Sequence, residues 1–96
     1  MIRLVEVTKK GAEYNPAIGM NKSFFGLREV FINPQMIISM RDDAGLREKN
    51  SKDEIIENLN KDSEFTVLTL NAGTNGKTIT VVGSVRSVCE RLGIHV

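Results

Sequence analysis

Two runs of β-forming residues near the C-terminus constrain the fold of this chain more than any other feature. The runs are 65–70 and 78–82, and Asn75-Gly76 lies between them. Asn-Gly is the favoured pair for a type I′ hairpin turn, because both central residues of that turn need positive φ. A tight turn at this pair predicts an antiparallel hairpin with Leu70 opposite Val81.

That register sorts the side chains of the hairpin onto two faces, because successive side chains of a strand point to opposite sides. One face is apolar throughout and consists of Leu68, Leu70, Ala72, Ile79 and Val81. The opposite face adds threonines to apolar residues and consists of Phe65, Val67, Thr69, Thr80 and Val82. The register and the hydrophobic pattern agree, which strengthens the prediction of a hairpin.

The segment after the hairpin is typical of a helix that covers a sheet. Ser84 is a favoured residue for the N-cap of a helix. The apolar residues that follow have the spacing of a single helical stripe: Val85, Val88, Cys89 and Leu92. Gly93 suits the left-handed position that ends many helices. We therefore predict a helix over 84–92 that packs on the sheet.

The N-terminal third of the chain carries weaker strand signals. Residues 1–8 alternate in part and predict a strand, whereas 9–27 contains scattered Gly, Asn and Pro and is interpreted as irregular. Two short strands are predicted at 28–32 and 36–40. Asn33-Pro34 separates them, because Pro lacks the N–H that a central strand needs.

The middle of the chain is rich in charged residues. Residues 41–50 are interpreted as a loop. The tetrapeptide Ser51-Lys52-Asp53-Glu54 matches a capping box, in which the serine hydroxyl accepts a hydrogen bond from the N–H of the glutamate. Apolar residues follow at helical spacing, which predicts a short helix near 52–60.

Together these segments predict an α+β fold with a small, mainly antiparallel sheet of four or five strands. The sheet carries the C-terminal helix (84–92), and the short helix near 52–60 lies beside it. We expect one domain over 1–96, because this length is typical of a single domain. Several strands are apolar on both faces, and one helix covers only one of them. We therefore expect a homo-oligomer that shares a sheet face or edge.

The composition excludes several classes of protein. Lysine and arginine total 13 and aspartate and glutamate total 12, so the formal net charge of +1 is too small for binding nucleic acid by charge alone. The single cysteine, Cys89, cannot form an internal disulfide. Arg3 and Glu6 interrupt the N-terminal segment, which is not typical of a signal peptide. No apolar run reaches the ~18 residues of a membrane span, so we expect a cytoplasmic protein.

The motifs of enzymes are incomplete. Gly76-Lys77-Thr78 resembles the end of a phosphate-binding loop, but the first glycine of that motif would fall on Asn71, and a β-rich run follows. Cys89 has only His95 as a candidate base and lies on the apolar stripe, which favours a core residue. Acidic pairs such as Asp42-Asp43 lack metal-ligand spacing. We therefore predict no catalytic residue, no cofactor and no metal site, and hence no enzyme.

Aromatic and basic residues between 9 and 28 form the strongest candidate for a binding site. The candidate partner-binding residues are Phe24, Phe25, Tyr14, Lys22 and Arg28. Aromatic residues in loops can anchor protein partners, while the alternative is that Phe24 or Phe25 folds back to plug the sheet. A nucleic-acid-binding surface in the same region would use Lys9, Lys10, Lys22 and Arg28, with weak and salt-sensitive affinity.

Short blocks along the chain form a strand–turn–strand–helix pattern. The blocks are Met1-Ile2-Arg3-Leu4, Val30-Phe31-Ile32-Asn33, Met36-Ile37, 65–70, Asn75-Gly76-Lys77, Val81-Val82 and Ser84-Val85 with Val88. Their order resembles the FlbD/SwrD-like family of small bacterial flagellar and swarming proteins. The additional residues at 9–27 and 41–63, with Gly83 in place of the family's usual acidic residue, are as consistent with a phage-encoded or accessory relative as with a motility protein.

The resemblance implies a binding or regulatory role without enzymatic chemistry. We therefore expect a small non-enzymatic protein-interaction or regulatory module that self-associates. The alternative is a nucleic-acid-binding module that uses a weakly basic aromatic loop.

Overall fold

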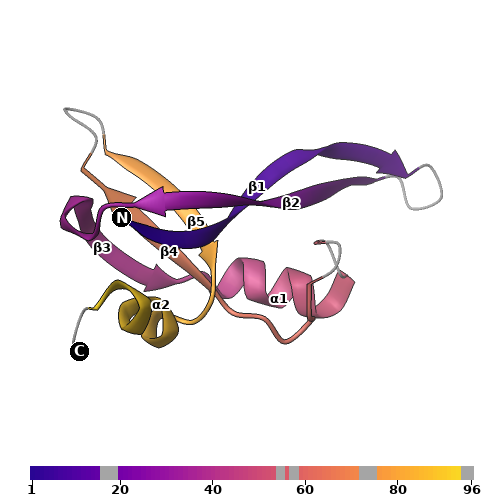
Figure 1. Cartoon of the computed structure of the whole chain (residues 1–96). Helices are drawn as coiled ribbons and strands as arrows, with labels where there is room; N and C mark the ends of the chain where they lie inside the picture. The colour runs from indigo at the N-terminus through magenta and orange to yellow at the C-terminus, as the bar shows by residue number, and fades with distance from the viewer. Residues whose placement is uncertain (16–19, 54–55, 57–58, 72–75, 94–96) are drawn as a thin grey trace.

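The protein is a five-stranded sheet with two helices (Figure 1). The computed structural model describes residues 1–15, 20–53, 56, 59–71 and 76–93, with the backbone alone at 10–15, 20–24 and 53. The strands lie in the order β2-β1-β5-β4-β3, and all neighbours are antiparallel. Their bounds are β1 Ile2–Asn15, β2 Met20–Ile32, β3 Ile37–Asp42, β4 Phe65–Leu70 and β5 Lys77–Val82. The predicted α+β fold with a mainly antiparallel sheet is confirmed.

The prediction that 9–27 is irregular is wrong, because β1 and β2 form one long hairpin through most of this segment. Their pairing runs from Ile2 opposite Ile32 to Asn15 opposite Met20. A register shift between Lys9 and Gly11 absorbs one extra residue of β1, as a bulge does. Glycine is tolerated at such sites, so the glycines of this segment do not end the strands. The far end of the hairpin projects well beyond the rest of the molecule (Figure 1).

The predicted pair of strands around Asn33-Pro34 is confirmed. A 3₁₀ turn, η1 (Pro34–Met36), joins β2 to β3. The Asn33 side chain accepts a hydrogen bond from the backbone N–H of Gln35 at 3.1 Å, which begins the turn. Proline suits the first position of a helical turn, where its missing N–H removes no hydrogen bond.

The second helix, α1 (Ala44–Asp53), begins eight positions earlier than the predicted helix near 52–60 and occupies most of the expected loop at 41–50. Its cap is Asp43, whose Oδ1 accepts a hydrogen bond from the N–H of Leu46 at 3.1 Å. Ser51 lies inside the helix and donates its hydroxyl to the Glu48 carbonyl at 2.8 Å, so it is not the cap. Of the residues after α1, Ile56 forms a β-bridge, and 54–55 and 57–58 lie outside the described residues.

The β4–β5 hairpin is confirmed, but its register differs from the one predicted. Leu70 lies opposite Lys77 rather than Val81, and Leu68 lies opposite Ile79. The connection is therefore longer than a two-residue turn, and the predicted turn residue Asn75 lies outside the described residues. The shift is an even number of positions, so the side chains of β4 and β5 stay on their predicted faces, and Ala72 lies outside the described residues.

Two hydrophobic clusters lie on opposite faces of the sheet. The larger is packed under the C-terminal helix α2 (Val85–Leu92) and consists of Leu4, Ile32, Leu68, Ile79, Val81, Val88 and Leu92. The smaller is on the α1 side and consists of Val7, Ile56 and Phe65, with Phe25, Leu46, Leu59 and Val82 packed against it. Phe65 and Leu68 are three residues apart on β4, so their side chains point to opposite faces.

The ends of α2 agree with the sequence prediction. The Ser84 hydroxyl accepts a hydrogen bond from the N–H of Ser87 at 3.1 Å, and Gly93 ends the helix with φ 73°. Cys89 is buried on the covered side of this helix, as the apolar stripe predicts. This helix therefore seals its face of the sheet.

Candidate interaction surface

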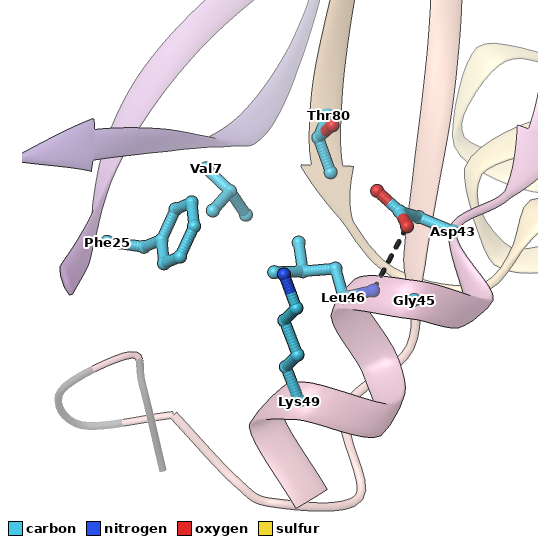
Figure 2. Close-up of a pocket in the computed structure, with 7 residues that line it drawn as sticks. All are labelled: Val7, Phe25, Asp43, Gly45, Leu46, Lys49 and Thr80. Atoms are coloured by element: carbon cyan, nitrogen blue, oxygen red, sulfur yellow. Dashed lines mark hydrogen bonds between the residues drawn. The ribbon is translucent and has the colours of Figure 1, made fainter. Parts of the chain in front are cut away.

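An open cavity of about 300 Å³ lies between α1 and the β1–β2 hairpin (Figure 2). Residues from β1, β2, β5, α1 and the position just before α1 line it: Val7, Phe25, Asp43, Gly45, Leu46, Lys49 and Thr80. Four elements that are distant in the sequence thus build one depression. Its volume is at the lower end of the range of small-ligand sites, which is ~300–1,000 Å³.

The walls of this cavity are mainly apolar. Val7 and Phe25 come from the hairpin and Leu46 from α1, and all three also contact the smaller hydrophobic cluster. In Figure 2 the Phe25 ring and the Leu46 side chain face the same space from two sides. Phe25, a predicted partner-binding residue, is half-buried, so it both contributes to the core and lines the depression.

One lysine and one carboxylate line the cavity, and a second lysine lies on the adjoining strand. Lys49 is exposed on α1 and lines the opening, and Lys9 is exposed directly opposite Phe25 in the hairpin. Within the described part of the chain, neither lysine forms an ion pair. Asp43 also lines the cavity, and one of its oxygens accepts the hydrogen bond that caps α1.

The other predicted site residues lie elsewhere along the hairpin. Tyr14 is opposite Asn21 near its far end, and Lys22 is opposite Glu13. Phe24 is opposite Gly11, and Lys10 lies in the bulge between Lys9 and Gly11. The side chains of Tyr14, Lys22, Phe24 and Lys10 lie outside the described residues. Of the predicted site residues that the structure describes, Phe25 lines the cavity, Lys9 is its cross-strand neighbour, and the backbone of Tyr14 lies far along the hairpin.

Arg28 is part of an ion pair at the base of the hairpin. Its Nε donates to Oε1 of Glu6 at 2.9 Å, and the Glu6 side chain is only 10% exposed. Arg3 and Glu29 form a second pair at 2.9 Å between the same two strands. Burying a carboxylate is costly unless a charged partner compensates it, so Arg28 has a structural role beside any role in binding.

β2 is an edge strand of the sheet, and along its outer side Phe25 forms a β-bridge with Ile56. Leu27 and Phe31 on this strand are 37% and 57% exposed, and both point to the face opposite α2. The strand β3 forms the other edge, where Ile38 is 64% exposed beside a register shift between Ile37 and Ser39. Solvent-exposed apolar side chains on an unpaired strand are typical of a surface that contacts another chain.

The sequence analysis missed Leu27, Phe31, Leu46 and Lys49 as candidate surface residues. Leu27 and Phe31 occupy the positions of β2 that alternate with the buried Ile32 and the half-buried Val30. Extending the predicted strand 28–32 towards the N-terminus would therefore have placed both residues on the exposed face. No local sequence pattern identifies Leu46 and Lys49 as surface residues of a site, because their position beside the cavity depends on where α1 packs.

The pKa of one exposed carboxylate, Glu48, is shifted. The pKa of Glu48 is lowered from its usual 4.5, mainly by the hydrogen bond from Lys52 and then by the charge of that lysine. Glu48 is an exposed residue of α1, so this shift reflects a surface pair. Among the described residues, no cluster of three or more His, Cys, Asp or Glu is placed to hold a metal ion. In the same part of the chain, no helix is long and apolar enough to cross a membrane.

Comparison of the chain with protein-family models, with curated proteins and with solved structures found no match. The resemblance to the FlbD/SwrD-like family therefore stays a prediction.

Proposed function

We propose that this protein is a small non-enzymatic interaction module that self-associates through the outer edge of β2, chiefly the part that follows the bridge between Phe25 and Ile56. The observation that carries the proposal is a 13-residue edge strand with Leu27 and Phe31 exposed on one face. An edge strand offers unpaired N–H and C=O groups to another strand, and the added strand also covers neighbouring side chains. A regulatory role, as in the resembling family, is compatible with such a module.

The β2 edge is a better candidate than the β3 edge for two reasons. The β3 strand has only six residues, and it is interrupted by a register shift. Short and bulged edges are the devices by which proteins avoid strand pairing. The bulge of the β1–β2 hairpin, in contrast, takes its extra residue from β1 and leaves β2 continuous.

A two-fold axis normal to the sheet would pair β2 with the same strand of a second copy. An axis through Arg28 or Glu29 would place like charges opposite each other, which is unfavourable. An axis through Leu27 avoids this and brings the exposed apolar side chains of both copies onto one face, with Glu29 of the second copy replacing Ile56 as the neighbour of Phe25.

The oligomeric state in solution tests this proposal. Light scattering coupled to size-exclusion chromatography at high micromolar concentration should give a dimer for the wild type. Phe31→Lys should shift the protein to monomer, because lysine on an edge strand opposes pairing. Ile38→Lys is the matched control on the β3 edge and should remain dimeric. A wild-type protein that is strictly monomeric under these conditions would rule the proposal out.

A nucleic-acid-binding module is the second candidate, and the projecting hairpin is the observation in its favour. Its sequence carries Lys9, Lys10 and Lys22, while Arg28 is already paired with Glu6. Fluorescence anisotropy with a labelled oligonucleotide at two salt concentrations separates the two candidates. Binding that disappears as salt increases would favour this second function, because few phosphate contacts give weak, salt-dependent affinity.

A further inference from the structure

We propose that the cavity between α1 and the β1–β2 hairpin accepts an apolar side chain from an acidic segment of a protein partner. This inference rests on the proposed role of the protein as an interaction module. It concerns a different surface from the β2 edge, so the two can fail independently.

The shape of the cavity suits a single anchoring side chain. Val7, Phe25 and Leu46 provide an apolar lining from both sides of an opening of about 300 Å³. Anchor residues of protein interfaces insert into such preformed apolar pockets, where they contribute much of the binding energy. Gly45 lines the same space and leaves room in it, since a Cβ at this position would meet only Asp43 Oδ1, at 3.7 Å.

The charge around the cavity favours acidic residues beside the anchor. Lys49 lines the opening, and Lys9 lies on the same face as Phe25 as its cross-strand neighbour. Asp43 is the one acid among the described lining residues; it accepts a hydrogen bond from the N–H of Leu46 and keeps its negative charge. Lys49, Lys9 and Asp43 together therefore leave one positive charge around the opening. Carboxylates of a partner would therefore meet Lys49 at the opening, with Lys9 on the adjoining strand, which favours specificity and a faster association rate.

The chain itself contains an example of this mode of packing. Ile56 is 1% exposed, forms a parallel β-bridge with Phe25, and packs in the cluster with Val7 and Phe65. In the sequence, Ile56 lies between Glu54 and Glu57. An aliphatic side chain from an acidic segment is thus already accommodated beside Phe25. A partner with the same pattern would occupy the adjoining open space.

Three synthetic peptides with blocked ends test the proposal by nuclear magnetic resonance titration of the ¹⁵N-labelled protein. The first has a central leucine flanked by two glutamates on each side. The second has lysines in place of the glutamates, and the third has serine in place of the leucine. The first peptide should shift the amide signals of Val7, Leu46 and Lys49 in a saturable way. Equal shifts from the second or third peptide, or none from the first, would overturn the proposal.

Two pairs of variants locate the binding site. Lys49→Glu should weaken binding of the acidic peptide about tenfold at low salt, whereas Arg86→Glu on α2 makes the same charge change on the other face and should have no effect. Gly45→Leu should abolish binding by filling the cavity, while Gly45→Ala should retain it. Loss of binding in both Gly45 variants, or in neither, would contradict the assignment of the site. Failure here together with a Phe31-dependent dimer would leave the proposed function intact.

Discussion

The two faces of the sheet are covered to very different degrees. On one face, α2 contributes Val88 and Leu92 to the larger hydrophobic cluster, and its Cys89 is buried as well. On the other face, α1 has a single large apolar residue, Leu46, and an open cavity remains beside it. The difference follows from the sequences of the two helices, since only α2 has an apolar stripe at helical spacing. A well-sealed face supplies stability, and the incompletely sealed face is where a partner finds room.

The largest expected effect on stability comes from truncating one apolar side chain on each face of the sheet. Leu68→Ala should lower the free energy of unfolding by about 3 kcal/mol, because it leaves a cavity in the closed cluster. Leu46→Ala should lower it by about 1 kcal/mol, because Leu46 is half-exposed and its removal only enlarges an open space. Urea unfolding measures both. Equal losses would mean that the two faces contribute alike.

A smaller effect is expected from removal of the helix caps. Ser84→Ala and Asp43→Ala each remove a side chain that accepts one backbone N–H, with an expected cost of about 1 kcal/mol. The two variants should differ in whether they destabilise one helix or the whole fold. Because α1 contributes little to a closed core, Asp43→Ala should accelerate amide hydrogen exchange in 46–53 alone. Ser84→Ala should lower the global stability instead. Faster exchange throughout the molecule in Asp43→Ala would contradict this difference.

The smallest expected effect is the pH dependence of the Glu48–Lys52 pair on α1. The pKa of Glu48 in the folded protein is below its usual 4.5, so the pair stabilises the helix above that pH. This contribution should disappear as the pH falls through the lowered pKa. Lys52→Met should return the pKa of Glu48 toward 4.5, as measured by nuclear magnetic resonance of the side-chain carboxyl. An unchanged pKa in that variant would show that Lys52 is not the cause.

The sequence predicted the α2 side of the molecule better than the α1 side. Ser84 and Gly93 are local signals, and the apolar stripe between them has only one helical interpretation, so α2 agrees within one residue. The faces of β4 and β5 were also correct, since alternation alone determines them. Their register was not, because the loop length depends on which cross-strand pairs pack best, and Asn75-Gly76 reports only a local turn preference.

The α1 side was mispredicted because its signals are tertiary. Asp43 and Ser51 are both acceptable caps, and the choice between them depends on where β3 ends and on what α1 contacts. The continuation of β1 and β2 depends on each strand supplying the hydrogen-bond partners of the other, which no single stretch of sequence reveals. The cavity is a product of both elements. Its lining residue Leu46 could therefore not be identified from the sequence, and Phe25 was found for its aromatic character alone.

The burial of Cys89 has a practical consequence. It is the only cysteine of the chain, and its side chain is 3% exposed on the buried side of α2. Reagents such as maleimides react with the exposed thiolate, so labelling has to wait until α2 separates from the sheet. The rate of labelling thus reports the opening of the sealed face directly, without any introduced probe. Mass spectrometry of the single adduct could follow that opening while a ligand occupies the opposite face.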